Sequence, residues 1–229
     1  MDAQPDEALV PETAADGAAD GAAEAAVDDE VDWAAYYRYT AGRAPRALFE
    51  RARAVLAVTG RKPGQAIEVG FGDGTETAEL LAAGWRVLAI DAQRAAAAAL
   101  EARVPAADRP RLVTVVASAE TVDLPVADLV YSGFSLPYLG PERLAVLWPR
   151  VRAALAPGGL IVVNLFGDRD ENAGEPDVAF LDRATVERLL DGLEIIELDE
   201  HEEDAGSFRG PKHWHLFDIV ARRRPGPGR

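Results

Sequence analysis

The stretch that decides the fold of this 229-residue chain is Glu68-Val69-Gly70-Phe71-Gly72-Asp73-Gly74-Thr75. It continues a short apolar run over 65–70 and leads into a helical pattern over 75–83 that stops at Gly84. Glycines between a strand and a helix permit positive φ and let a ligand approach the backbone, while the first helical turn presents unpaired amide donors. The stretch therefore predicts a strand, a ligand-binding turn and a helix in succession.

Strand and helix patterns alternate along most of the chain. Helices are expected over about 45–58, 75–83, 92–103, 141–155 and 184–191, and strands over 65–70, 86–90, 112–116, 127–131, 159–165, 193–198 and 213–221. Such alternation is typical of an α/β domain, in which helices cover both faces of a parallel sheet and ligands bind at the carboxyl ends of the strands. One domain over 31–224 is sufficient.

The charge of the chain is concentrated at its beginning. The chain carries 24 Lys and Arg against 39 Asp and Glu, a formal net charge of −15. Residues 1–30 hold six Asp and four Glu without Lys or Arg, so −10 belongs to them and −5 to the rest. That segment lacks aromatics and is predicted to be a disordered acidic tail, with an acidic docking arm as the alternative. Residues 225–229 are predicted to be a frayed terminus.

Composition also excludes several functions. The chain has no cysteine, so it holds no disulfide, Cys-ligated metal or cysteine nucleophile, and an intracellular protein is the simplest interpretation. No apolar run reaches the ~18 residues of a membrane span, and the acidic start lacks the basic region of a signal peptide. The acidic balance and the lack of a basic stripe disfavour nucleic acid and anionic membranes. We therefore expect a cytoplasmic protein without a metal site, and its oligomeric state stays open.

Asp91 closes the strand that follows the glycine-rich turn. A carboxylate at this place suits the two hydroxyls of a ribose, so turn and acid together indicate an adenosine-type ligand. The dinucleotide pattern G-x-G-x-x-G would need glycine at position 75, where the chain has Thr75, and no Gly-Lys-Ser or Gly-Lys-Thr supports ATP binding. The glycines instead fall at 70, 72 and 74, with Glu68 two residues ahead.

On these residues the sequence resembles the class I S-adenosylmethionine-dependent methyltransferases, whose first motif reads acid-x-G-x-G-x-G. Ser118-Ala119-Glu120 with Leu124-Pro125, Asp128 to Ser132, and the turn at 155–159 resemble later motifs of the same family. The resemblance implies a Rossmann-like sheet of seven mostly parallel strands with an antiparallel last strand, and S-adenosyl-L-methionine as cofactor. Trp33 with Tyr36-Tyr37, and the segments 134–137, 166–170 and 212–215, look like the tellurite-resistance-type subgroup that acts on small molecules.

The resemblance also implies which residues hold the cofactor and the substrate. Ser118 departs from the family pattern, which often has an acid there. The cofactor-binding residues that it implies are Glu68, Gly70, Phe71, Gly72, Gly74, Asp91, Ala92, Ser118, Ala119, Glu120, Ser132 and Tyr37. Phe134, Asp168, Arg169 and His215 are the substrate-binding candidates, because they follow strands at the ligand-binding edge or lie on the last strand. For Asp168 and Arg169, pairing with each other is the alternative.

Methyl transfer from a sulfonium is an in-line displacement, in which the protein mainly aligns the reactants and excludes water. If the acceptor is a hydroxyl or a protonated amine, a base helps, and histidine is suited to that role near neutral pH. The chain has three histidines, and His213 is the candidate base because an antiparallel last strand would begin at the ligand-binding edge. The hypothesis is methyl transfer to a small molecule; the alternatives are a cofactor-binding protein without transfer activity and an NAD-linked oxidoreductase.

Overall fold

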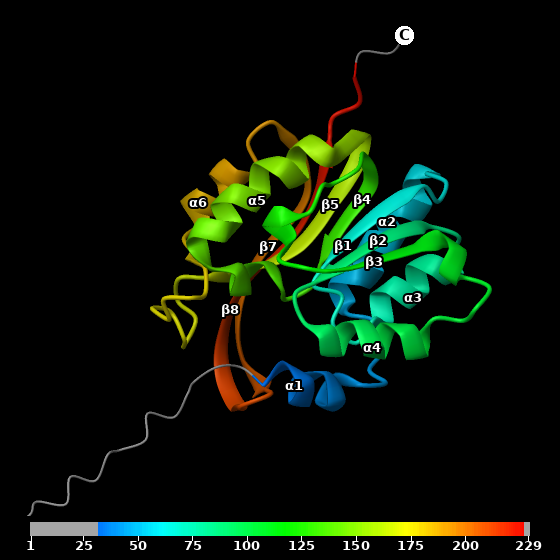
Figure 1. The fold of residues 1–229 in the computed structure, drawn as a ribbon. Helices are drawn as coiled ribbons and strands as arrows, with labels where there is room; N and C mark the ends of the chain where they lie inside the picture. The colour runs from blue at the N-terminus through cyan, green and yellow to red at the C-terminus, as the bar shows by residue number, and fades with distance from the viewer. Residues whose placement is uncertain (1–31, 227–229) are drawn as a thin grey trace, which may run out of the picture. The chain divides into compact units, whose positions relative to one another are not determined.

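The computed structural model describes residues 32–226, and these residues form a central sheet covered by helices (Figure 1). Its strands run in the order β3-β2-β1-β4-β5-β8-β7. Their bounds are β1 Gln65–Val69, β2 Arg86–Asp91, β3 Leu112–Val116, β4 Ala127–Ser132, β5 Leu155–Gly167, β7 Leu193–Ser207 and β8 Gly210–Arg223; the two-residue β6, Phe180–Leu181, pairs with β5. All neighbouring pairs on the path from β3 to β5 are parallel, whereas β8 is antiparallel to both β5 and β7.

The helices divide between the two faces of the sheet. The α-helices are α1 Trp33–Thr40, α2 Ala47–Thr59, α3 Thr75–Ala82, α4 Arg94–Arg103, α5 Gly140–Ala154 and α6 Arg183–Leu189, with three short 3₁₀ turns, η1 Arg109–Arg111, η2 Ala119–Thr121 and η3 Leu136–Leu139. Buried side chains of α2, α3 and α4 belong to one hydrophobic cluster, and those of α5 and α6 belong to the other. The sheet therefore has an α2 face and an α5 face.

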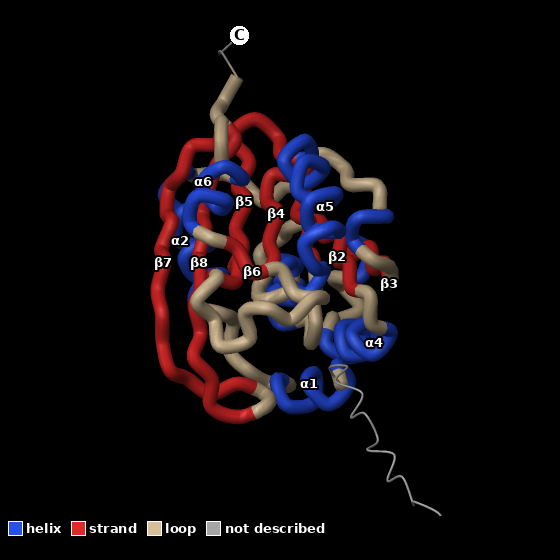
Figure 2. Tube along the Cα trace, turned by 90° about the vertical axis from the view of Figure 1, so that its left-hand side faces the viewer, coloured by secondary structure: helices blue, strands red, loops and turns tan. Residues whose placement is uncertain are grey.

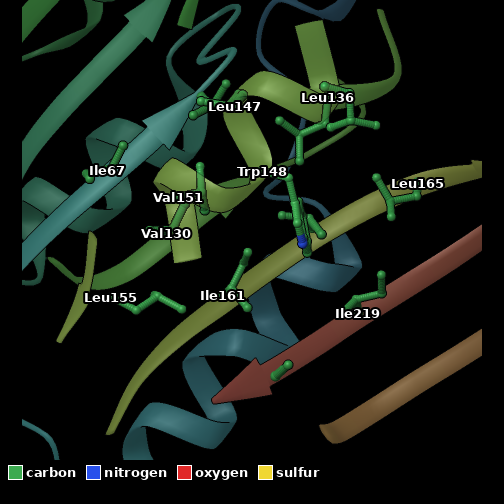
Figure 3. Packing of buried hydrophobic residues seen from close by; sticks show 14 of the residues in the cluster. Ile67, Val130, Leu136, Leu147, Trp148, Val151, Leu155, Ile161, Leu165 and Ile219 are labelled. Atoms are coloured by element: carbon green, nitrogen blue, oxygen red, sulfur yellow. The ribbon is translucent and has the colours of Figure 1, made fainter. Parts of the chain in front are cut away.

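Alternation along the buried strands supplies both clusters. In β1, Ile67 and Val69 face α5, whereas Ala66 faces α2. Figure 3 shows Trp148 and Val151 of α5 packed over β4 and β5 in the first cluster. Strands that are apolar on both faces are typical of a parallel sheet covered on both sides, and this explains their nearly continuous apolar runs.

The last two strands form a hairpin that extends beyond the rest of the sheet. β5 pairs with β8 only from Leu160–Arg222 to Phe166–Leu216, whereas the β7–β8 pairing continues to Ser207–Gly210 at the tip. Figure 2 shows α1 close to the tip of this hairpin. The rings of Tyr36 and Tyr39 lie 5.8 Å and 5.6 Å from that of Phe208 in the turn, so α1 and the hairpin tip pack together at the carboxyl ends of the strands.

The predicted fold class is confirmed: the protein has a mixed α/β fold with a mostly parallel sheet. Apart from the two-residue β6, the described part of the chain has seven strands, and the last of them, β8, is antiparallel to β5. The hairpin is longer than expected, because β7 continues from Leu198 to Ser207 through a charged stretch whose apolar content is low. Backbone pairing with β8 keeps that stretch extended, which no apolar alternation signals. The tail predicted at 1–30 lies outside the described residues, as do the last three residues of the predicted frayed terminus. No helix among residues 32–226 is long and apolar enough to cross a membrane.

Candidate cofactor and acceptor site

The glycine-rich turn joins β1 to α3 in a conformation that requires its glycines. Gly70, Gly72 and Gly74 all have positive φ, at 72°, 54° and 75°. The amide of Gly70 donates to the carbonyl of Ile90 on β2 at 2.7 Å, and Gly74 precedes the first residue of α3. The turn therefore lies beside the end of β2, at the carboxyl edge of the sheet.

Asp91 ends β2 directly beside this turn. Its side chain accepts the amide of Gly72 at 2.9 Å on Oδ2 and the amide of Gln93 at 2.9 Å on Oδ1. The residue is 7% exposed, and burial raises the pKa of its carboxyl. A carboxylate has about four lone-pair sites, so Asp91 keeps acceptor capacity for ligand hydroxyls at this edge.

Tyr37 of α1 covers Asp91. Its hydroxyl donates to Oδ1 of Asp91 at 3.3 Å, and the residue is buried. Its ring carbons also lie nearest to Gly72, where a Cβ would be 3.5 Å away. Tyr37 thus lies beside both Asp91 and the glycine turn, where the sequence places a cofactor-binding residue.

A network of charges holds the connection between α1 and α2 against α3. Arg43 donates to both carboxylate oxygens of Glu76, at 2.6 Å and 2.5 Å, and to Asp73 at 3.1 Å. Arg103 of α4 donates to the other oxygen of Asp73 at 3.1 Å. Because Asp73 and Glu76 are almost completely buried, these bidentate pairs fix the glycine turn and the first turn of α3 relative to α1.

Glu68 lies behind the turn rather than at its ligand-facing side. It is 1% exposed and accepts the hydroxyl of Thr77 at 2.5 Å. Burial, and then the neighbouring charge of Glu76, raises the pKa of the Glu68 carboxyl well above its ordinary value. The side chain links β1 to α3 in the interior. The geometry therefore does not favour direct contact between this carboxylate and the cofactor.

We expect Glu68→Gln to stabilise the protein at pH 8. An acid with a raised pKa in the folded state loses stability as the pH rises above its unfolded pKa, near 4.5, because only the unfolded chain ionises freely. The variant should raise the melting temperature at pH 8 by at least ~2–4 °C, the shift that ~1 kcal/mol produces at this size. Thermal unfolding followed by circular dichroism checks it, and the gain should vanish near pH 4. A lower melting temperature at pH 8 would contradict the prediction.

The expected adenine-side residues lie beyond β2 and β3. The hydroxyl of Ser118 donates to Glu120 at 2.5 Å, Ala119 is buried in the α5-side cluster, and Ala92 is exposed. Two other expected cofactor residues are buried. Phe71 packs in the α2-side cluster, and Ser132 is fully buried and donates to the carbonyl of Val69 at 2.8 Å. The side chain of Ser132 therefore joins β4 to β1, and its expected role in cofactor contact stays a prediction.

An aromatic cluster lies beyond the ends of β4 and β5. The ring of Phe134 is 5.9 Å from that of Trp214 and 6.3 Å from that of Phe166. Phe134 has φ of 57°, rare for a residue with a side chain, and such strain often marks functional loops. Lys212 lies over the rings of Trp214 and Phe166, at 4.0 Å and 5.4 Å, and pairs with buried Asp170 at 2.7 Å. The position of Phe134 is compatible with the predicted acceptor contact.

The geometry does not favour the expected role of His213 as the base. β8 does begin beyond the edge, but strand alternation directs Lys212 and Trp214 toward Phe134 and Phe166, and His213 lies on the opposite face. Its ring contacts Asp204 at 2.7 Å and Glu202 at 3.2 Å on β7. These carboxylates raise the pKa of His213, so less of the imidazole is neutral and free to accept a proton near neutral pH.

The remaining substrate candidates hold the loop after β5 against the hairpin. His215 is fully buried; its Nδ1 accepts the amide of Arg169 at 3.0 Å, and its Nε2 lies 3.1 Å from Glu200. The guanidinium of Arg169 pairs with Glu200 and Glu202 on β7, and with Asp168 at 3.7 Å. Both ring nitrogens of His215 are thus engaged within the protein, and its expected role in substrate contact stays a prediction.

Sequence reasoning missed several residues that the fold brings to this edge. Arg46 precedes α2, and its guanidinium lies 4.8 Å from the ring of Phe134. Tyr131 on β4 is 1% exposed, and its hydroxyl has no hydrogen-bond partner among the described residues. Lys212 and Trp214 belong to the segment 212–215, but the sequence did not indicate that their side chains lie in the aromatic cluster. No spacing in the sequence links Arg46 to Tyr131, since they are 85 positions apart.

One histidine–carboxylate cluster lies away from this edge. Atoms of Asp199, His201 and Asp218 lie within 4.8 Å of one another on β7 and β8. Arg51 of α2 pairs with Asp218 and reaches Asp199 at 4.0 Å. The guanidinium therefore balances the carboxylates, and the cluster is a structural ion network between α2 and the hairpin.

The comparisons with known proteins agree with this site. Residues 67–161 match a family model described as a methyltransferase domain. The chain is 32% identical over 145 residues to trans-aconitate 2-methyltransferase of Paracidovorax citrulli and 31% identical over 146 residues to that of Delftia acidovorans. The matches cover 61% and 62% of this chain. The chain spans about half the length of the curated relatives it matches, 52% in each case.

Solved structures show the same fold. TehB from Haemophilus influenzae has a TM-score of 0.65 at 14% identity, covering 84% of this chain and 67% of that one. The Burkholderia thailandensis 1,6-didemethyltoxoflavin N1-methyltransferase has a TM-score of 0.57 at 20% identity, covering 78% of this chain and 79% of that one. Residues 67–161 therefore match a methyltransferase domain, and the described fold is shared with a solved N1-methyltransferase. The match agrees with the resemblance to the class I S-adenosylmethionine-dependent methyltransferases that the motifs indicate.

Proposed function

We propose that this protein transfers a methyl group from S-adenosylmethionine to a small-molecule acceptor at the carboxyl edge of its sheet. The observation that carries the proposal is the pairing of the glycine-rich turn with Asp91: the amide of Gly72 lies 2.9 Å from the buried carboxylate at the end of the next strand. Such an acid beside such a turn suits ribose hydroxyls. When bound, the cofactor supplies an electrophilic methyl group.

The chain's own residues position and enclose the reactants. Gly70, Gly72 and Gly74 let the cofactor approach the backbone closely, and Asp91 receives hydroxyls at one end of the site. Tyr37 covers this end, while Phe134 and Trp214 border the other. Aromatic walls exclude water and align the acceptor with the methyl group, and in-line displacement needs little more from the protein. No histidine among the described residues is placed as a free base beside Phe134.

The test measures binding and turnover separately. Calorimetry with S-adenosylmethionine and S-adenosylhomocysteine reports cofactor binding. Incubation with a metabolite library then reports S-adenosylhomocysteine formed above the acceptor-free background. We expect the protein to bind the cofactor and to form S-adenosylhomocysteine with an acceptor. We also expect His213→Ala to retain most of the wild-type turnover with any acceptor found. Absence of cofactor binding would overturn the proposal.

The same measurements separate the two alternatives. A protein that binds the cofactor without transferring methyl would give calorimetric binding and no product with any acceptor. An NAD-linked oxidoreductase would bind NADH tightly and S-adenosylmethionine not at all. The departure from the dinucleotide pattern at Thr75 disfavours that alternative, since α3 begins there with a β-branched residue in place of the third glycine.

A further inference from the structure

One side chain of α1 lies on both parts of the expected ribose site. The hydroxyl of Tyr37 donates to Oδ1 of Asp91 at 3.3 Å, and its ring would lie 3.5 Å from a Cβ placed on Gly72. Tyr37 is the one buried residue of α1. With α1 in this position the ribose end of the site is covered, so α1 has to move for a cofactor to enter or leave.

α1 is too short to hold this position by itself. It has eight residues, whereas an isolated helix needs about 12–15 residues to be even marginally stable in water. The chain is fixed again at Arg43, which pairs with the buried carboxylates of Asp73 and Glu76. Between α1 and Arg43 lies Gly42, which has a positive φ of 79° and where a Cβ would meet nothing within 4 Å. Residues 41–42 therefore form a short hinge, and contacts with other elements decide where α1 lies.

The tip of the β7–β8 hairpin supplies such contacts. Phe208 lies in the two-residue turn between Ser207 and Gly210, and α1 lies beside this tip (Figure 2). The ring of Phe208 is 5.8 Å from that of Tyr36 and 5.6 Å from that of Tyr39. These two tyrosines are three positions apart and so share one face of α1. Phe208 therefore packs on α1 on both sides of Tyr37 in the sequence.

The hairpin itself is anchored close to its tip. The ammonium of Lys212 pairs with buried Asp170 at 2.7 Å, in the loop after β5. In the same loop the amide of Glu171 donates to the carbonyl of His213 at 3.0 Å, and the amide of His213 donates to the carboxylate of Glu171 at 2.9 Å. The hairpin tip is thus the fixed partner of the contact, and α1 is the movable one.

We propose that Phe208 is a positioning residue that holds α1 over the ribose end of the site and thereby sets how fast the cofactor enters and leaves. This inference rests on the proposed function and adds to it a gate on cofactor exchange. Phe208 acts through Tyr36 and Tyr39 rather than on Asp91 itself. Aromatic pairs of this kind are individually weak, so the contact can break and form again in each cycle of binding and release.

The contacts of Phe208 exist in the free protein, and this fixes the kinetic effect of losing them. Because they favour the closed position of α1 with and without the cofactor, their loss raises the population of the open position in both states. Opening both admits and releases the ligand, so the association and the dissociation rate constants should increase together. Damage to the binding surface itself would raise the dissociation rate constant alone.

The test measures both rate constants for S-adenosylhomocysteine by surface plasmon resonance on the immobilised full chain. We expect Phe208→Ala to raise each of them at least threefold. Phe208→Tyr keeps the ring and should bind at wild-type rates. Ile195→Ala truncates a side chain that is 47% exposed near the opposite end of β7, and it should change neither constant. Unchanged rate constants in Phe208→Ala, or an increase in the dissociation rate constant alone, would overturn the proposal.

Tyr39 allows a second test that leaves Phe208 in place. Its side chain is 67% exposed, and its ring contacts that of Phe208. Tyr39→Ala should also raise both rate constants, by less than Phe208→Ala does. In the double variant it should add little to Phe208→Ala, because the two substitutions remove the same contact. Effects that multiply in the double variant would contradict the proposal.

Hydrogen exchange separates the opening of α1 from a loss of folding. The amides of residues 33–40 should exchange faster in Phe208→Ala, while those of β1 and β2 keep their wild-type protection. Faster exchange throughout the sheet would assign the change to global destabilisation and overturn the proposal. If the wild type binds no S-adenosylhomocysteine at all, the proposed function fails and the gate fails with it. If the wild type binds it and Phe208→Ala exchanges it at wild-type rates, only the gate fails.

Discussion

Replacing Asp91 by alanine is expected to lower the affinity for S-adenosylmethionine by about 100-fold or more. Hydrogen bonds to a charged partner contribute about 1.5–3 kcal/mol each, and the carboxylate would receive two ribose hydroxyls. The substitution also leaves the amides of Gly72 and Gln93 without their acceptor, so the turn loses its contact with the end of β2. Calorimetric titration of the purified variant measures the loss.

Two matched variants serve as controls for Asp91→Ala. Asp123→Ala removes the same charge from an exposed side chain whose nearest cation, Arg150, is 3.9 Å away, and it should bind as the wild type does. Tyr37→Phe removes the hydroxyl that donates to Oδ1 of Asp91 and should reduce the affinity far less than Asp91→Ala. Unchanged affinity in Asp91→Ala would contradict the site.

Replacing Gly70 by alanine destabilises the protein by about 2–5 kcal/mol. Its positive φ costs an alanine about 1–2 kcal/mol, and overpacking typically adds about 1–3 kcal/mol, because the new Cβ would collide with the hydroxyl and Cβ of Ser135. Urea unfolding of the variant at 25 °C measures the change in the free energy of unfolding.

Gly42 offers the control for backbone strain alone. It also has positive φ, at 79°, but a Cβ there would meet nothing within 4 Å. Gly42→Ala should therefore cost only the conformational part, about 1–2 kcal/mol. In Gly70→Ala, the added change Ser135→Gly should restore part of the lost stability by removing the collision. Equal losses in Gly42→Ala and Gly70→Ala would show that the contact with Ser135 does not matter.

Local sequence signals were sufficient for the sheet and its cofactor edge. The apolar runs that form β1, β2 and β4 are buried on both faces, so each run is nearly continuous and is bounded by glycine or a polar residue. The turn at 70–74 could be predicted because only glycine adopts its three positive φ values without strain. Asp91 could be predicted because consecutive parallel strands end at the same edge.

Local signals were not sufficient for the acceptor side. His213 was selected for the chemistry of its ring, but the alternation of β8 turns it toward Asp204 and Glu202, and its neighbours Lys212 and Trp214 face the aromatic cluster. His215 is the substrate-binding candidate on the same strand, and its burial against the loop after β5 became visible only when β5 and β8 were paired.

The sequence by itself determined the order of strands and helices, the conformation of the glycine turn and the acid beside it, because each depends on residues that are neighbours in the chain or on strands of fixed direction. Only the tertiary structure decided which polar groups remain unpaired. Arg43 and Arg46 are three positions apart and chemically identical, yet the fold places Asp73 and Glu76 against the first and leaves the second beside Tyr131. Charge balance at a site depends on contacts between distant segments, and these contacts exist only in the folded chain.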